Sequence, residues 1–334
     1  MKHKLLNIVM LSALSCSAVA QQKDDLRIVA VHKIHSDGGW DYLSIDQESK
    51  NLFVSHGNQV NILNSKGDSV GVISNTPGVH GIALVNTLGK GYTSNGKAAS
   101  CSVFDLKTFA VTAQISVGQN PDALFYDDFS KKVIVFNGKS KDASIIDPQT
   151  DKVVATIPLG GKPEAGVSDG KGKIYVNIED TSEIVCFDAI SFKVLARYKL
   201  KDGEEPSGLA IDRETSRLFT VCANKKILIL DAASGKQITA LPIGDECDGV
   251  VFDPATKTAY AANGEGNITV VKEVSANKFM LKGTVKTAVG ARTIAIDYSR
   301  HLLFLPTADF EKTTAAGQRP KKIPGTFRVL VAGK

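Results

Sequence analysis

The segment from residue 122 to residue 157 reads Asp122-Ala-Leu-Phe-Tyr-Asp127, then Lys132-Val-Ile-Val-Phe-Asn137, then Ser144-Ile-Ile-Asp147, and then Lys152-Val-Val-Ala-Thr-Ile157. Each run is short and rich in aromatic and β-branched residues, and turn formers such as Gly138 and Pro148 lie between the runs. This composition and punctuation predict four consecutive β-strands joined by tight turns.

The same four-run unit recurs along the chain. Each unit opens on one polar residue, and these openers are Asp41, His80, Asp122, Glu164, Ser207, Asp248 and Arg292. The steps between successive openers are 39, 42, 42, 43, 41 and 44 residues. A repeat of this length with four short strands is typical of a propeller blade. The sequence therefore predicts an all-β fold, a seven-bladed β-propeller of four-stranded blades.

The seventh unit is one strand short. It contains Ile294-Ala-Ile-Asp297, Leu302-Leu-Phe-Leu305 and Phe327-Arg-Val-Leu-Val331, and then the sequence ends. The missing outer strand has a counterpart before the first unit, where Arg27-Ile-Val-Ala-Val-His-Lys-Ile34 shows the same alternation. We expect this N-terminal strand to pair with the last blade and close the ring, which leaves no open blade edge.

The first twenty residues have the pattern of a signal peptide. Lys2 and Lys4 precede an apolar run over residues 5–15, and Ala18-Val19-Ala20 forms a small-x-small cleavage site. The run is too short to span a bilayer as a helix. A buried N-terminal helix and a lipoprotein anchored through Cys16 are the alternatives. We expect 1–20 to be a signal peptide, 21–334 to form a single propeller domain, and the protein to be periplasmic or secreted, with no transmembrane segment.

The channel mouth is the expected ligand site. The first strand of each blade lines the channel and the second runs antiparallel to it, so first-strand starts and second-strand ends share one rim. The second-strand ends, expected as an outer ring, are His56, Asn95, Asn137, Asn177, Cys222, Asn263 and Thr307. The candidate ligand-binding residues, for a small molecule or a protein partner, are Asp41, His56, His80, Asp122, Glu164, Asp248 and Arg292.

Part of this set has the composition of a metal site. Imidazoles and carboxylates together suit a divalent transition metal, and the candidate ligands are His56, His80, Asp41 and Asp122. The alternative is that both histidines are solvated polar residues. Crowded carboxylates also raise one another's pKa and could serve general acid–base chemistry, or they could form a hydrated acidic funnel with Arg292 as partial counter-ion.

Four cysteines follow the predicted signal peptide. Cys222 ends a second strand and Cys247 precedes the next blade's first strand, so they are a candidate disulfide if their Cα atoms fall within about 7 Å. Otherwise they are two thiols near Asp248. Cys101 and Cys186 lie inside third strands and are expected as buried small hydrophobes. A C-x-x-C pair, as in zinc ribbons and thioredoxin-like proteins, is missing from the sequence.

Nucleic-acid binding has weak support. The formal charge of +5 becomes +3 without Lys2 and Lys4 (5 − 2 = 3). The polar stretch from Thr307 to Ile323 is expected as a surface loop, and its basic candidates are Arg319, Lys321 and Lys322. An acidic mouth would repel a phosphate backbone, and the sequence shows no basic–aromatic interleaving for base stacking. The sole tryptophan, Trp40, is either a ring-stacking platform or a core anchor.

Several phrases resemble a known family. Ile146-Asp-Pro-Gln-Thr-Asp-Lys-Val-Val-Ala-Thr-Ile-Pro-Leu-Gly160, Lys162-Pro163-Glu164 and Gly172-Lys-Ile-Tyr-Val-Asn177 are similar to the YVTN-repeat β-propellers, the YncE-like proteins. The similarity extends over the chain after residue 20, although Phe219-Thr-Val-Cys222 and Phe304-Leu-Pro-Thr307 depart from the Tyr…Asn pattern. The resemblance implies a propeller fold and an exported binding or scaffold protein, with DNA binding among the activities it allows. It does not assign a function, because the repeat residues are structural.

Motifs of several enzyme classes are missing from the sequence: the Gly-rich phosphate loop, G-x-S-x-G, H-E-x-x-H and C-x-x-C-H. The sequence therefore favours an exported binding or scaffold propeller that uses its polar mouth. The alternative is a metal-dependent hydrolase or lactonase-like enzyme with the metal at the mouth, and a weaker alternative is a DNA-binding propeller.

Overall fold

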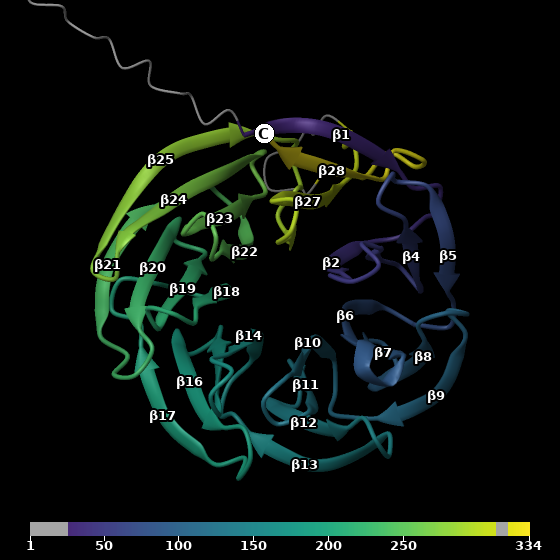
Figure 1. The fold of residues 1–334 in the computed structure, drawn as a ribbon, viewed down its shortest axis with the longest axis horizontal. Coiled ribbons are helices and arrows are strands. Elements are labelled where there is room, and N and C mark those ends of the chain that lie inside the picture. The colour runs from purple at the N-terminus through teal and green to yellow at the C-terminus, as the bar shows by residue number, and fades with distance from the viewer. Residues whose placement is uncertain (1–25, 312–319) are drawn as a thin grey trace, which may run out of the picture.

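The computed structural model describes residues 26–311 and 320–334, and within them the chain forms seven four-stranded antiparallel sheets. The sheets are arranged as blades around a central channel (Figure 1). The predicted seven-bladed β-propeller is therefore confirmed. The predicted signal peptide, residues 1–20, lies outside the described residues. Over those same described ranges, no helix has the length and apolar character needed to cross a membrane.

Six blades take their strands in chain order, from the channel outward. The first three consist of β2 (Trp40–Ile45), β3 (Leu52–His56), β4 (Gln59–Leu63), β5 (Ser69–Ile73); β6 (Val79–Val85), β7 (Lys90–Asn95), β8 (Ser100–Asp105), β9 (Val111–Ser116); β10 (Pro121–Asp127), β11 (Lys132–Asn137), β12 (Asp142–Asp147) and β13 (Lys152–Pro158). The next three consist of β14 (Pro163–Ser168), β15 (Lys173–Ile178), β16 (Glu183–Asp188), β17 (Val194–Lys199); β18 (Pro206–Asp212), β19 (Arg217–Cys222), β20 (Lys226–Asp231), β21 (Gln237–Pro242); β22 (Cys247–Asp253), β23 (Thr258–Asn263), β24 (Asn267–Ser275) and β25 (Lys278–Lys286). One turn of 3-10 helix, η1 (Asn86–Leu88), joins β6 and β7.

The seventh blade is built from both ends of the described chain. Its order is β26 (Ala295–Asp297), β27 (Leu302–Thr307), β28 (Arg328–Gly333) and β1 (Arg27–Lys33). β1 pairs antiparallel with β28 from Arg27 opposite Gly333 to Lys33 opposite Arg328, with one bulge after Ile28. Figure 1 shows β1 lying along the outer edge of this blade. The predicted closure of the ring by the N-terminal strand is confirmed.

Apolar side chains between neighbouring blades form the core. One cluster joins Val85 and Tyr92 of the second blade to Leu124 and Val133 of the third. Another contains Phe219 of the fifth blade and Phe252 of the sixth, whose rings stack with centroids 5.0 Å apart. Because each blade packs one face against the next, the sheets bury their apolar residues without a central core, and the middle is left as a channel.

The aspartates that end the inner strands tie adjacent blades together. Asp127 ends β10; it accepts hydrogen bonds from the turn at Ser130 and from Ser168 Oγ (2.6 Å) at the end of the next blade's inner strand. Asp253 Oδ2 lies 2.8 Å from His301 Nδ1 of the next blade, within hydrogen-bond distance. The repeated aspartate of the sequence units is therefore a structural residue on the rim opposite the openers.

We predict that removing β1 opens the ring. A chain beginning at Ile34 should lose about 3 kcal/mol or more of unfolding free energy, because the outer strand pairing of the seventh blade is gone. That corresponds to a fall in Tm of roughly 6–12 °C. Thermal denaturation followed by circular dichroism measures it, with a chain beginning at Leu26 as the matched control. Equal Tm values for the two chains would show that β1 does not hold the ring.

Candidate functional site

The polar openers reach the channel mouth through one repeated backbone device. In each of the first six blades the opener is the second residue of the inner strand, and the pairing with the second strand is irregular there. Asp122, for example, falls in the break between the pairs formed by Pro121 and Leu124. A β-bulge frees a residue from the regular alternation and redirects its side chain. The bulges therefore turn the openers toward the channel.

Small residues after several openers allow the inner strands to come close. A Cβ on Gly208 would lie 2.9 Å from Val250 N and 3.0 Å from Asp248 O of the next blade. A Cβ on Gly249 would lie 3.0 Å from Ile294 N. Glycine is needed where two backbones approach this closely. The close approach brings the openers of adjacent blades within reach of one another.

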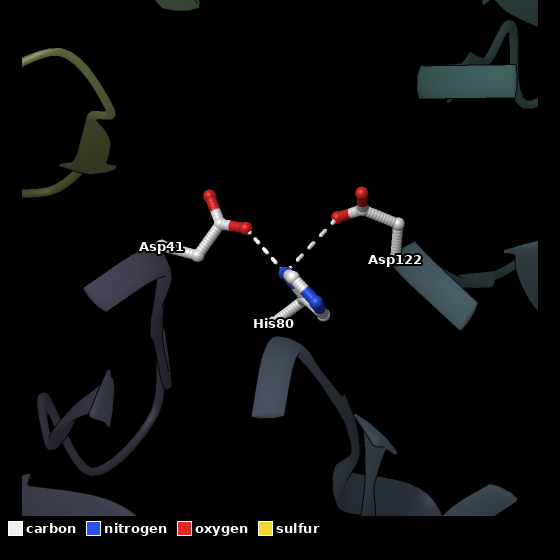
Figure 2. A group of neighbouring side chains, drawn as sticks. All are labelled: Asp41, His80 and Asp122. Carbon is white, nitrogen blue, oxygen red and sulfur yellow. Dashed lines mark hydrogen bonds and ion pairs between the residues drawn. The ribbon is translucent and has the colours of Figure 1, made fainter. Parts of the chain in front are cut away.

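Asp41, His80 and Asp122 form the central group of the mouth. Figure 2 shows the two carboxylates flanking the same imidazole nitrogen, with side chains from β2, β6 and β10 pointing toward one another. His80 Nδ1 lies 2.6 Å from Asp41 Oδ2 and 3.6 Å from Asp122 Oδ1. The three ligand atoms lie within 4.8 Å of one another. The side chains are partly shielded, with 30% of His80, 17% of Asp41 and 14% of Asp122 exposed.

One carboxylate oxygen of Asp122 has no hydrogen-bond donor in the part of the protein that the structure describes. This oxygen, Oδ1, is buried. The nearest candidate, His80 Nδ1, is too distant for a hydrogen bond and can give its single proton to Asp41 instead. Burial, followed by the charge of Asp41, raises the pKa of Asp122 to about 7. Asp122 Oδ1 is therefore a buried acceptor that a cation or a hydrogen-bond donor would satisfy.

His80 is tuned toward its charged form. Burial of the imidazole lowers its pKa, but the hydrogen bond to Asp41 and the charges of Asp122 and Asp41 outweigh burial, so the pKa of His80 is raised. Its Nδ1 can donate to Asp41 in either protonation state, provided that the proton of the neutral ring sits on that nitrogen.

The fourth blade contributes a lysine between two glutamates. Lys162 Nζ lies 2.8 Å from Glu164 Oε1 and also contacts Glu179 Oε2. Burial and the nearby charge of Asp122 raise the pKa of Glu164 to about 9. Sequence reasoning missed Lys162 and Glu179. Their signal was positional, because Lys162 stands just before β14 and Glu179 just after β15, on the rim shared by the openers.

The sixth and seventh blades supply an ion pair. Arg292 Nε lies 3.1 Å from Asp248 Oδ2. Burial raises the pKa of Asp248 to about 6, against the opposing charge of Arg292. The fifth opener, Ser207, donates its hydroxyl to Cys247 O at 3.1 Å. The structure thus places six of the seven predicted ligand-binding residues at one mouth: Asp41, His80, Asp122, Glu164, Asp248 and Arg292.

His56 lies elsewhere. Its side chain is almost fully buried, its ring stacks on Phe327 with centroids 3.7 Å apart, and its Nδ1 lies 2.5 Å from Ser36 Oγ. Burial lowers the pKa of His56 to about 4. The candidate metal set of four therefore reduces to His80, Asp41 and Asp122. His56 ends β3 opposite Trp40, and its ring packs against Phe327 of the last blade instead of joining His80.

The expected outer ring of second-strand ends is likewise internal. Asn95, Asn137 and Asn263 are buried and donate to Ser102, Ser144 and Thr269 on the neighbouring strand of their own blades. Their amide groups thus link the second and third strands of these blades.

Cys222 and Cys247 are free, as are the other two described cysteines, Cys101 and Cys186. The candidate disulfide is not formed, because the two side chains pack in different clusters. Cys222 lies with Leu209 and Leu228, whereas Cys247 lies with Val250 and its thiol donates to Gly249 O at 3.7 Å. Burial raises the pKa of both thiols.

Trp40 anchors the seam between the first and last blades. Its ring stacks on Phe327 with centroids 5.2 Å apart, and Lys322 Nζ sits 4.9 Å from its centroid. Lys322 also donates to Gly38 O at 3.0 Å. One of the basic candidates for nucleic-acid binding is thus engaged within the protein, Lys321 is exposed, and Arg319 lies outside the described residues.

The channel below the mouth contains a cavity of about 360 Å³. Its wall has both polar and apolar surface, with the apolar part somewhat larger, and includes Leu84, Phe125 and Ile294, with Asp248 near the mouth. Tyr42 also lines the cavity. Burial, followed by the charges of Asp122, Asp41, Glu164 and Asp248, raises the pKa of Tyr42. Tyr42 therefore lies both in the cavity wall and near the carboxylates of the mouth. The sequence alone did not indicate this position.

Comparison with solved structures finds the same fold. The chain is similar to Kuenenia stuttgartiensis hydrazine synthase with a TM-score of 0.70 and 16% identity, over 81% of this chain and 94% of that chain. It is similar to U3-55K with a TM-score of 0.77 and 7% identity, over 91% of this chain and 99% of that chain. No protein-family model and no curated protein matches the sequence. The comparisons show the propeller fold, and the resemblance to YVTN-repeat proteins is not confirmed by a family match.

We predict that Asp122→Asn stabilises the protein more at pH 8 than at pH 5. The raised pKa of Asp122 means that the folded protein holds this proton more tightly than the unfolded chain, so its contribution to stability is lost as pH rises toward 7. Asparagine removes that loss, and the gain in unfolding free energy at pH 8 should be about 1–3 kcal/mol. Urea denaturation at the two pH values measures it.

The matched control for this variant is Glu48→Gln, an exposed acid in the turn after β2 on the opposite rim. It should give the same small change at both pH values. A gain for Asp122→Asn that did not depend on pH would contradict the assignment of a raised pKa.

Proposed function

We propose that this protein is an exported binding propeller whose ligand site is the channel mouth. The observation that carries the proposal is the group of charged side chains converging there, with Asp122 Oδ1 left without a hydrogen-bond donor from any residue that the structure describes. A propeller is suited to such a role, because its rigid blades hold groups from distant parts of the chain around one axis. The mouth opens over a cavity of about 360 Å³, within the size range of small-molecule sites.

Export is part of the same proposal, and it rests on the pattern of residues 1–20. It is tested by expressing the full chain and sequencing the N-terminus of the protein recovered from each cell fraction. A protein that begins at Gln21 in the periplasm or medium supports export. A cytoplasmic protein that keeps residues 1–20 opposes it.

The binding role is tested with a panel of small molecules and ions in a thermal-shift assay. A ligand at a hundred times its Kd adds about 2.7 kcal/mol to the unfolding free energy, which gives a readily measured rise in Tm. We expect a compound that raises the Tm of the wild type and has little effect on the double variant Asp122→Asn/Asp248→Asn. Compounds that act equally on both proteins would place binding away from the mouth.

A second candidate function is a metal-dependent hydrolase or lactonase-like enzyme. The specific observation in its favour is the group Asp41, His80 and Asp122, whose ligand atoms lie within 4.8 Å of one another. One nitrogen and two carboxylate oxygens form a donor set that a divalent transition metal accepts, with further positions open to water or substrate. A bound metal would polarise a carbonyl or lower the pKa of a bound water.

Metal content decides between the two candidates. For the enzyme, elemental mass spectrometry of protein purified from its native compartment without chelator should find near-stoichiometric metal that His80→Ala loses. The control His35→Ala, an exposed histidine before β2, should retain it. A wild-type protein that holds no metal and gains no stability from added Zn²⁺, Mn²⁺ or Ca²⁺ would remove the enzyme and leave the binding propeller.

A further inference from the structure

We propose that the ligand of the mouth is a primary amine with an apolar body, whose ammonium group binds between Asp122 and Asp41 and whose body enters the channel beside Tyr42. This inference rests on the proposed function of the mouth as a binding site, and it names the ligand class.

Most of the acidic side chains at the mouth have a cationic partner within the protein. Lys162 contacts both glutamates of its group, Arg292 lies 3.1 Å from Asp248, and His80 lies 2.6 Å from Asp41. The remaining acid is Asp122, with its nearest cationic atom at 3.6 Å and its buried Oδ1 without a donor among residues 26–311 and 320–334. Asp122 is therefore the one carboxylate of this group without a cation within hydrogen-bond distance, and its unsatisfied atom is Oδ1.

An ammonium group suits the unsatisfied oxygen of Asp122 and its neighbours. An ammonium group carries three N–H donors, so it can satisfy Asp122 Oδ1 and the outer lone pairs of Asp41 together. Its third donor would remain for the Tyr42 hydroxyl, or the charge could lie over the Tyr42 ring in a cation–π contact. Carboxylates combined with an aromatic ring match the chemistry of an ammonium head group.

The cavity below the mouth can hold the apolar body of such a ligand. Its volume is about 360 Å³, and its lining includes Leu84, Phe125, Leu209, Val250 and Ile294, which stand on the inner strands or just before them. Apolar surface of this kind gains free energy by excluding water in favour of an alkyl or aryl group. A bare metal ion would satisfy the carboxylates but would leave this surface unused, and it would have to displace the proton that His80 Nδ1 gives to Asp41.

The test uses isothermal titration calorimetry with 2-phenylethylamine on the chain from Gln21 onward. The matched probes are 2-phenylethanol, which lacks the charge, and 3-phenylpropionate, which reverses it. At pH 8 we expect the amine to bind at least tenfold more tightly than the alcohol and the acid not to bind measurably. Asp122→Asn should weaken the amine at least tenfold, whereas the control Glu48→Gln should leave it unchanged.

Three outcomes would overturn the ligand class. They are equal affinity for the amine and the alcohol, unchanged affinity in Asp122→Asn with its circular dichroism spectrum intact, and amine binding that requires added Zn²⁺ or Mn²⁺. If the amine fails while another compound of the panel acts through Asp122 and Asp248, the ligand class is wrong and the binding function stands. If no compound acts through the mouth, both proposals fall.

Discussion

The antiparallel pairing of β1 with β28 joins the two ends of the described chain, and the arrangement of the mouth depends on it. The pairing supplies the outer strand of the seventh blade and so fixes the first and last blades as neighbours. A closed circle makes the seven inner strands converge on one axis. Contacts such as the 2.6 Å hydrogen bond between His80 and Asp41 join side chains of different blades, so they require each blade to hold a defined position relative to the next.

The channel also sets the electrical character of the mouth. Carboxylates on the outer surface would be well solvated, but here burial raises the pKa of Asp122 to about 7 and that of Asp248 to about 6. Lys162 and Arg292 compensate part of this charge from inside the protein. A free-energy cost from buried charge is common at ligand sites. The carboxylates that destabilise the empty site gain a partner when a ligand binds.

The sequence was sufficient to predict the fold, the closure of the ring and the shared rim of the openers, because the repeat length and the antiparallel order of the strands determine all three. It was not sufficient for His56, because the direction of a side chain at a strand end depends on packing, here against Phe327. The disulfide between Cys222 and Cys247 was predicted wrongly for a similar reason. Two side chains on neighbouring strands need not point toward one another. Tyr42 was missed because the sequence does not show which way the residue beside an opener faces, and Lys162 was missed because it stands two residues before its opener, just outside β14.

The bulges at the openers have an evolutionary consequence. A residue that sits in a bulge is outside the regular hydrogen-bond ladder, so exchanging its side chain leaves the strand pairing of the blade in place, although contacts between openers such as His80 and Asp41 change. Six blades offer such a position. The rim therefore behaves as an interchangeable set of sites on a constant frame. Descendants of one propeller could acquire new ligands by single substitutions there, and a designer could alter selectivity by the same route without redesigning any blade.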